Sequence, residues 1–527
     1  MNLRTHLAVC DPKALDSIFA PYDQCQFPGV AVAVAIDGRP VYRRGFGLAN
    51  MELPVLLTPG TRMRIGSTTK HFVALAFLLL CEEGLASLEA HIGQYVPQLH
   101  SVNDAVTMGA LMSHTSGLRD VFQVSMFMHG IGRTITDAQL LEYYRQIDDR
   151  EFPAGTGWSY NNGGYLLLTA AIERITGQRL DEVLEQRIFA PLGMYDTRLR
   201  RWDNDFLPNS ASLHMLDPRC GYTKVTTGME LTGAGGIVSS MDDMLRWLHH
   251  MDAPLVGSAA TWRVLRSPVL LADGTPTSYG LGLVADRYLG LATLSHAGGV
   301  FGGNSQMIKV PAAGLDISIA VNRADANAID LAFRVIDACV PGLDAVANEP
   351  IDPNVCGVYR SPRSGRVLEV TALDGRGVLR VDGGMPMGLS PAGSGAWKMS
   401  PMFAFLGLTV RTESGGLVFG QFGSEDVLER LVPASAAVLG AYSGRYRCDG
   451  VAVTAWVREE DGEARLITEG RFGVARYALR PLGAQVWQAQ ALDPLAPTGG
   501  VLTFAERADD FTLNADRMRN VRFQRVA

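Results

Sequence analysis

The stretch GSTTKHF, residues 66–72, stands just before the apolar run ALAFLLL and decides how this chain is interpreted. If a helix begins here, Ser67 and Lys70 lie one turn apart and share a face. A lysine whose pKa is lowered by burial or by nearby cations can accept the seryl proton, and the positive end of the helix favours negative charge gathering at the serine. The pair is therefore a candidate nucleophile and base. The alternative is a serine helix cap beside a solvated lysine.

Composition indicates a large globular chain. Its 527 residues are 47% hydrophobic and 19% charged, which indicates roughly two to four domains and no extended disorder. The net charge is −7 and no basic patch stands out, so we expect no nucleic-acid partner. Lysine is rare, which makes the only Ser-x-x-Lys of the sequence more informative; the lysines are Lys13, Lys70, Lys224, Lys309 and Lys398.

Cysteine usage and hydropathy indicate a cytoplasmic protein. The seven cysteines are scattered without a Cys-x-x-Cys pair, which argues against a disulfide framework and a structural zinc site. The first residues show no signal-peptide pattern, and no apolar run reaches the ~18 residues of a membrane span. We expect no membrane association. The cysteines are Cys10, Cys25, Cys81, Cys220, Cys339, Cys356 and Cys448.

Residues 1–340 mix helical and strand patterns, which predicts an α/β (α+β) domain with a sheet flanked by helices. A hairpin is expected over residues 29–47, turning at Asp37-Gly38. Helices are expected from residue 67 to about 83, over 161–177 and 178–193, and over 241–251; strands are expected over 279–284 and 316–322.

The remaining sequence is strand-rich and reads as two copies of one unit. Residues 341–355 hold three prolines and form an expected linker. Residues 356–434 and 435–527 each open with Gly-x-Tyr, close with an arginine before an apolar residue, and contain evenly spaced short strands. This pattern favours two small antiparallel barrels. The alternative is a single sandwich built from both halves.

Two further motifs carry candidate chemistry. GWSYNNGGY, residues 157–165, contains Tyr160 and Asn162, where a tyrosine can relay protons and an asparagine can hold a substrate amide. SHAGGVFGG, residues 295–303, contains His296 as a candidate catalytic residue and Gly298 and Gly299 as candidate substrate-binding residues. A glycine-rich edge strand lets a substrate backbone approach closely. Taken singly, each also fits a structural role, as a capped helix with a packing aromatic or a buried histidine.

In this order the three motifs resemble those of the serine penicillin-binding proteins and class C β-lactamases, whose third motif is usually Lys-Thr-Gly. The stretches LMSHTSGL (111–118), FAPLGM (189–194) and SYGLGL (278–283) also match that family, over about residues 15–335. The chain is most similar to the D-aminopeptidase branch, which has His-x-Gly in place of Lys-Thr-Gly and two C-terminal eight-stranded lipocalin-like barrels.

The resemblance also implies a substrate-binding loop and a homodimer. In that branch a loop of the last barrel enters the active site and contacts the substrate amine; the matching stretch here is residues 488–500. Its only carboxylate is Asp493. The family aspartate directly precedes Ala-Pro, whereas Leu495 holds that place here and the loop is shorter. Asp493 is therefore a candidate amine ligand, and the alternative is that it caps the turn it opens.

The expected function is that of a serine exopeptidase releasing an N-terminal D-amino acid from peptides, amides and esters through an acyl-enzyme. Ser67 attacks, Lys70 accepts its proton, Tyr160 protonates the leaving amine, and Asn162 steadies Lys70 and the substrate. The backbone N–H groups of Ser67 and Gly299 form the oxyanion hole. No metal or organic cofactor is needed, and β-lactams are expected as inhibitors or poor substrates.

His296 bears on the choice among related activities. A histidine is mostly neutral near pH 7 unless perturbed, so it lacks the fixed charge with which Lys-Thr-Gly enzymes attract a substrate carboxylate. This favours an amine-ended substrate. The alternatives are a D-amino acid amidase or esterase, a β-lactamase or DD-peptidase-like hydrolase on the same fold, and a non-catalytic protein whose barrels hold an apolar ligand.

Overall fold

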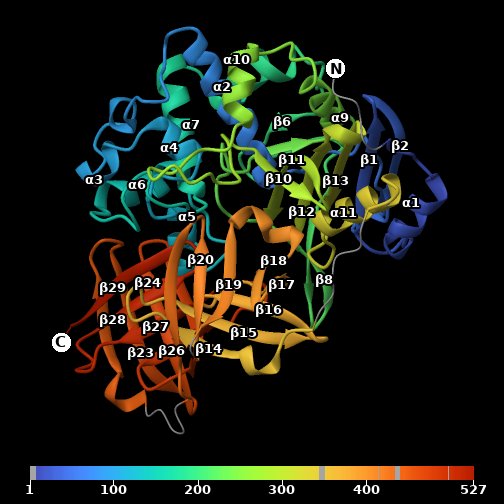
Figure 1. Cartoon of the computed structure of the whole chain (residues 1–527). Helices are drawn as coiled ribbons and strands as arrows, with labels where there is room; N and C mark the ends of the chain where they lie inside the picture. The colour runs from blue at the N-terminus through green and yellow to red at the C-terminus, as the bar shows by residue number, and fades with distance from the viewer. Residues whose placement is uncertain (1–6, 344–349, 414, 434–438, 497, 527) are drawn as a thin grey trace.

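A six-stranded antiparallel sheet forms the centre of the first part of the molecule (Figure 1). The computed structural model describes residues 7–343, 350–413, 415–433, 439–496 and 498–526. The hairpin expected over residues 29–47 is present, and Asp37 and Gly38 turn it with φ of 54° and 73°, as a two-residue hairpin requires. In spatial order the strands are β10 (Val284–Tyr288), β11 (Leu291–Val300), β12 (Gly303–Val310), β13 (Leu315–Val321), β1 (Val30–Ile36) and β2 (Arg39–Phe46).

Helices cover both faces of this sheet. The valines of β1 pack into the core formed with α1 (Pro12–Phe19) and α11 (Ala328–Cys339). The alternating alanines of β1 belong to the core that includes α2 (Lys70–Glu82) and α9 (Met241–His250). A strand buried on both faces needs an unbroken apolar run, which explains the sequence VAVAVAI of β1.

The other helices and short strands surround this layered core. The helices are α3 (Ser101–Asp104), α4 (Met108–Met112), α5 (Val121–His129), α6 (Asp137–Gln146), α7 (Asn162–Thr176), α8 (Leu180–Leu184) and α10 (Ala259–Arg266). The strands are β3 (Leu48–Asn50), β4 (Val55–Leu56), β5 (Met63–Arg64), β6 (Arg198–Leu199), β7 (Leu213–Asp217), β8 (Gly221–Val225) and β9 (Ile237–Ser239). Within the described ranges, no helix is both long and apolar enough to cross a membrane.

Two expected elements differ from the structure. The helix expected over residues 178–193 is α8 followed by a π-helical turn, Glu185–Phe189. The strand expected over 279–284 is wrong, because this stretch bends until β10 begins at Val284. Gly282 has a φ of 84°, and a Cβ there would lie 2.7 Å from the backbone nitrogen of His71. Gly282 therefore allows close packing against α2 and Gly280 against the end of α10, and the two glycines break the strand pattern.

Two closed eight-stranded antiparallel barrels follow, which confirms the expected barrels over the single-sandwich alternative (Figure 1). The first comprises β14 (Gly357–Arg360), β15 (Val367–Leu373), β16 (Arg376–Val381), β17 (Met387–Gly393), β18 (Ala396–Met399), β19 (Leu408–Glu413), β20 (Gly416–Gln421) and β21 (Ser424–Arg430). The second comprises β22 (Gly444–Cys448), β23 (Val453–Glu460), β24 (Glu463–Gly470), β25 (Gly473–Pro481), β26 (Val486–Ala491), β27 (Gly499–Phe504), β28 (Asp510–Ala515) and β29 (Met518–Val526). Residues 344–349 of the expected linker and residues 434–438 between the barrels lie outside the described residues.

The repeated Gly-x-Tyr and arginine signals meet where each barrel closes. In the first barrel the guanidinium of Arg430 lies 4.9 Å from the ring centre of Tyr359 and donates to its hydroxyl at 2.6 Å. In the second barrel Arg525 and Tyr446 repeat the arrangement at 5.2 Å and 2.9 Å. A Cβ at Gly357 would lie 2.8 Å from the arginine, so the glycine makes room for this cation–π closure.

The second barrel packs on the first domain through α5. The rings of Phe127 and Tyr477 stack with centroids 4.4 Å apart, and the Tyr477 hydroxyl donates to the carbonyl of Phe127 at 2.6 Å. Thr468 donates to the carbonyl of Met128 at 2.9 Å. One buried apolar cluster therefore runs from the helices of the first domain into the second barrel. Because α5 begins beside the candidate site, this contact ties the barrel to it.

Candidate active site

Ser67 and Lys70 form the centre of the site. A 3₁₀ turn, Gly66–Thr69, carries Ser67 and leads directly into α2, whose first residue is Lys70. Lys70 Nζ lies 3.0 Å from Ser67 Oγ, 2.8 Å from Asn162 Oδ1 and 2.7 Å from the carbonyl oxygen of Ala234. Ser67 is partly exposed and Lys70 is fully buried. A substrate can thus reach the hydroxyl while the amine stays sheltered from water.

The contacts of Lys70 fit a neutral amine. Burial lowers its pKa well below the usual value; the charge of Asp120 opposes this shift and that of Arg517 adds to it. A neutral amine has two N–H donors and one lone pair. Asn162 Oδ1 and the Ala234 carbonyl are acceptors and take the two N–H groups. The lone pair is then left for the hydroxyl of Ser67, which is the arrangement that a general base requires.

Tyr160 is hydrogen-bonded to Ser67 and lies over Lys70. The ring centre is 4.8 Å from Lys70 Nζ. Burial raises the pKa of Tyr160 above its usual value, while its hydrogen bond with Ser67 and the charge of Arg517 pull it down. The phenol is therefore protonated at neutral pH and can give its proton to an amine that leaves a carbonyl carbon attacked by Ser67.

Asp120 and Asn162 form hydrogen bonds that hold Lys70 in place beside Ser67. Asp120 caps α5 by accepting from the backbone of Phe122 at 3.1 Å, and it also accepts from Asn162 Nδ2 at 3.3 Å and from the backbone of Gly163 at 3.4 Å. The second contact turns the oxygen of Asn162 toward Lys70. The sequence analysis missed Asp120, although a capping residue before the apolar stretch of α5 was a usable signal.

His296 lies in an aromatic cluster next to the site. Its Nε2 is 2.8 Å from the hydroxyl of Tyr279 and its Nδ1 is 2.6 Å from the carbonyl oxygen of Ala297. Burial, with a smaller contribution from Lys70, lowers the pKa of His296 to about 3. The imidazole is therefore neutral at pH 7. Its two nitrogens are engaged with Tyr279 and the backbone, so its contacts position β11.

Glycines bring β11 against the serine turn. β10 pairs with β11 only as far as Ser295, so, among the described residues, residues 296–300 are paired on the β12 side alone. A Cβ at Gly66 would lie 2.8 Å from the nitrogen of Gly299, and one at Gly298 would lie 1.8 Å from the oxygen of Ile65. Gly299 is exposed, and a Cβ there would meet no atom within 4 Å. The backbone N–H groups near Ser67 and Gly299 are thus close neighbours beside open space.

The second barrel contributes a charge that the sequence analysis missed. Arg517, in the turn between β28 and β29, places its guanidinium carbon 5.5 Å from the ring centre of Tyr160. Its Nη1 lies 3.4 Å from Asp120 Oδ2, and Nη2 donates to Gln123 at 3.4 Å. No local pattern marks this arginine, because only closure of the barrel and its packing on α5 bring it to the site.

The structure does not bring Asp493 to this cluster. Asp493 is exposed, and its carboxylate accepts from the backbone nitrogen of Leu495 at 3.0 Å. In the described part of the chain no hydrogen bond or ion pair joins it to Ser67, Lys70 or Tyr160. The turn-capping alternative therefore describes its geometry. The stretch of the barrel that reaches the site is the β28–β29 turn; residue 497 of the expected loop is outside the described residues.

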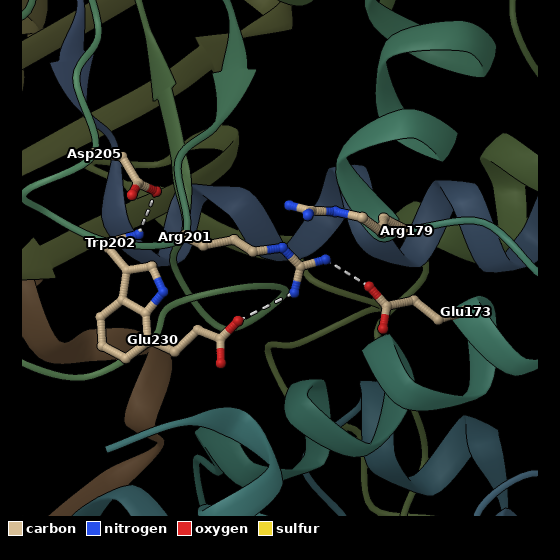
Figure 2. A pocket seen from close by; sticks show the side chains of 6 residues that line it. All are labelled: Glu173, Arg179, Arg201, Trp202, Asp205 and Glu230. Carbon is tan, nitrogen blue, oxygen red and sulfur yellow. Dashed lines mark hydrogen bonds and ion pairs between the residues drawn. The ribbon is translucent and has the colours of Figure 1, made fainter. Parts of the chain in front are cut away.

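A separate charged pocket of about 410 Å³ lies on the first domain. Figure 2 shows Arg201 in its middle, with its guanidinium between Glu173 and Glu230 at 2.6 Å and 3.3 Å. The other lining residues are Arg179, Trp202 and Asp205. None of the described residues that contact Ser67, Lys70 or Tyr160 lines it, and its charges are largely paired. Nowhere in the described ranges are three or more His, Cys, Asp or Glu side chains grouped to hold a metal ion.

Comparisons with known proteins show the family to which the chain is similar. The Beta-lactamase family model matches residues 15–339. D-aminopeptidases from Brucella melitensis biotype 2 and Gluconobacter oxydans are each 27% identical to this chain, over 510 and 531 residues, with 95% of this chain and 96% of the relative covered.

Solved structures share the fold. An octameric penicillin-binding protein homologue from Pyrococcus abyssi is 22% identical with a TM-score of 0.58, covering 80% of this chain and all of that one. The D-amino acid amidase of Ochrobactrum anthropi SV3, complexed with L-phenylalanine, is 24% identical with a TM-score of 0.52, covering 62% of this chain and 98% of that one.

Proposed function

The chain belongs to the beta-lactamase family, and we propose that it is a serine exopeptidase that releases an N-terminal D-amino acid from peptides, amides and esters. The observation that carries the proposal is the contact set of Lys70. Its two acceptors, Asn162 Oδ1 and the Ala234 carbonyl, leave the lone pair for Ser67. A buried neutral amine beside a serine hydroxyl has one evident chemical use, which is to make the serine a nucleophile.

The proposed reaction proceeds through an acyl-enzyme. Ser67 Oγ attacks the carbonyl carbon of the first residue and its proton passes to Lys70. The N–H groups of Ser67 and Gly299 hold the developing oxyanion. Tyr160 then protonates the leaving nitrogen and the C–N bond breaks. Water enters, loses a proton to the same groups, and attacks the ester, so that the free D-amino acid leaves and Ser67 regains its proton.

The choice of an N-terminal D-residue rests on the relatives. The D-aminopeptidases of Brucella and Gluconobacter match this chain over nearly its full length, barrels included. The neutral His296 gives no fixed cation of the Lys-Thr-Gly kind on β11, which supports an exopeptidase over a β-lactamase or DD-peptidase. The second candidate is a D-amino acid amidase or esterase, since the Ochrobactrum amidase shares the fold. β-Lactams are proposed as inhibitors or poor substrates.

A substrate panel tests the proposal. We expect hydrolysis of D-alanine p-nitroanilide, with at least about tenfold lower kcat/KM for the L-isomer and for the N-acetylated compound, and slow turnover of nitrocefin. Ser67→Ala should lose nearly all activity while keeping its melting temperature, and Lys70→Ala should lose a comparable amount because the two act as one unit. Faster turnover of nitrocefin than of D-alanine p-nitroanilide would contradict the assignment.

Cellular location and assembly are proposed on narrower grounds. All seven cysteines lie in the described ranges and are unpaired, which supports a cytoplasmic enzyme. A homodimer follows from the family resemblance, and light scattering tests it against larger assemblies. We also propose that residues 1–340 form the catalytic domain and that 356–434 and 435–527 form the two barrel domains. Limited proteolysis within residues 341–355 tests this division.

A further inference from the structure

Arg517 is the cation that the second barrel brings to the catalytic tyrosine. Its guanidinium carbon lies 5.5 Å from the ring centre of Tyr160. Since Tyr160 is the proposed donor to the leaving nitrogen, Arg517 lies on the side from which the leaving residue departs. The side chain is 23% exposed, so a substrate group can reach it.

The present contacts of Arg517 leave donors free. A guanidinium has five N–H donors, and three contacts with described residues are present: Asp516 at 3.2 Å, Gln123 at 3.4 Å and Asp120 at 3.4 Å. The partner Asp516 is 49% exposed, so this ion pair contributes little. Asp120 is already satisfied by three other donors. The guanidinium is therefore held in place but not saturated.

Distances in a dipeptide fit this position. The carboxyl carbon of a leaving residue lies about 2.5 Å from its nitrogen, because two backbone bonds separate them. Each further residue moves a terminal carboxylate up to about 3.3–3.6 Å away. With the leaving nitrogen at the Tyr160 hydroxyl, the carboxyl carbon of a dipeptide stays within about 2.5 Å of that nitrogen, whereas that of a longer peptide can lie several ångströms farther out. Arginine also matches a carboxylate with two parallel N–H donors.

We propose that Arg517 binds the free carboxylate of the leaving residue, so that the preferred substrates are dipeptides with a D-residue at the N-terminus. This proposal rests on the proposed function and narrows it. The cation that would hold this carboxylate belongs to the second barrel, whereas β11 carries the neutral His296. Arg517 is thus a specificity-determining residue.

Two matched substrates test it, D-alanyl-glycine and D-alanyl-glycinamide, which differ only in the terminal charge. We expect the wild type to favour the acid by at least about tenfold in kcat/KM, measured as released D-alanine. Arg517→Gln should bring this ratio close to one, mainly through the KM of the acid, and Arg517→Lys should restore part of it. The matched control is Arg522→Gln, which removes an exposed arginine from the same hairpin and should keep the full ratio.

The ratio separates recognition from general damage, because a misfolded or weakly active variant loses both substrates alike. An unchanged ratio in Arg517→Gln would overturn the proposal. Calorimetry of the two compounds binding to the Ser67→Ala protein tests the role of Arg517 separately. It does so even if the wild type cleaves neither compound and the proposed exopeptidase activity is contradicted. We expect tighter binding of the acid and loss of that difference when Arg517→Gln is added. Equal binding of the two compounds, or none, would also overturn it.

Discussion

Lys70, the proposed base, shows how burial and hydrogen bonding act together. Burial alone lowers the pKa of the amine, and it would do the same for a lysine with no function. The added information lies in the acceptors: Asn162 and Ala234 occupy both N–H groups of a neutral amine, and Ser67 faces the remaining lone pair. His296, with a pKa lowered to about 3, is equally neutral but has both nitrogens engaged elsewhere. Geometry separates the base from a positioning residue.

Two aspartates should respond differently to substitution. Asp493→Asn should leave kcat/KM for D-alanine p-nitroanilide within about twofold, because an exposed turn cap contributes little to the site. Asp120→Asn should lower it by ten- to a hundredfold, since a buried carboxylate that orients Asn162 makes charged hydrogen bonds of about 1.5–3 kcal/mol.

Asp493 also provides a test of the family resemblance. Asp493→Asn should keep the preference of the enzyme for free amines over N-acetylated substrates. A rise in KM confined to free-amine substrates would show instead that Asp493 holds the ammonium group, with the loop in a different position when substrate is bound.

The residues of the site divide by how far their partners lie in sequence. Ser67 and Lys70 could be predicted because one helical turn joins them. Tyr160, Asn162 and His296 were predictable only as a set, from their order in the chain. Asp120 has a local capping signal that is common to many helices. Arg517 has none, because its meeting with Tyr160 depends on barrel closure and on the packing of β25 against α5.

At the scale of elements, the contact between β11 and the 3₁₀ turn Gly66–Thr69 sets the width of the site. Glycines allow the two backbones to touch. The same property explains the wrong strand prediction at residues 279–284, where glycines in an apolar run pack against α2 and the end of α10 instead of forming a strand. The spacing of apolar residues in a short run does not show which backbone segments will pack against that run. The two barrels were predictable because their repeated signals mark strand ends.

A pair of glycine substitutions tests this contact. Gly298→Ala places a Cβ 1.8 Å from the oxygen of Ile65, so β11 must move away from the serine turn. We expect destabilisation of about 1–3 kcal/mol and loss of most activity. Gly299→Ala meets no atom within 4 Å and should keep the wild-type melting temperature. Equal melting temperatures for both variants would show that the contact does not constrain β11.

For the whole molecule, buried histidines predict acid sensitivity. Burial lowers the pKa of His129 and His250 to about 4 and that of His296 to about 3. A histidine in the unfolded chain has a pKa of about 6.5, so below this pH the unfolded chain binds more protons than the folded one. As the pH is lowered, the free energy of unfolding then falls by up to about 1.4 kcal/mol per pH unit for each histidine. Burial also lowers the pKa of His71, His114 and His214, which act in the same sense, whereas Asp137, whose pKa burial raises to about 7, acts in the opposite sense.

We therefore expect the melting temperature to fall steadily from pH 6.5 to 5. His250→Asn should reduce this slope, because its amide oxygen can replace Nδ1 as the acceptor of the backbone N–H of Leu255 without taking up a proton. A melting temperature that is flat or rises over this range would show that these imidazoles gain protons without cost in the folded protein.

The distribution of the cores predicts how the molecule unfolds. The apolar cluster of the first domain continues through Phe127 and Tyr477 into the second barrel, whereas the first barrel has its own core around Leu379. Calorimetry should therefore show two transitions, one for the first barrel and a larger one in which the catalytic domain and the second barrel unfold together. Chain order alone would have grouped the two barrels, since they are consecutive copies.

Two core substitutions assign these transitions. Tyr477→Ala removes the stacked ring and the hydroxyl that donates to Phe127. It should lower the free energy of unfolding of the larger transition by about 3–5 kcal/mol and leave the other transition unchanged. Leu379→Ala should lower the free energy of unfolding of the first barrel alone, by about 2–5 kcal/mol. Arg517 belongs to the same barrel as Tyr477. Tyr477→Ala should therefore also reduce the preference for D-alanyl-glycine over D-alanyl-glycinamide, even though Tyr477 contacts the end of α5 opposite to the Asp120 cap. A shift of both transitions by either variant would mean that the three units share one cooperative core, and the second barrel would then not be coupled selectively to the catalytic domain.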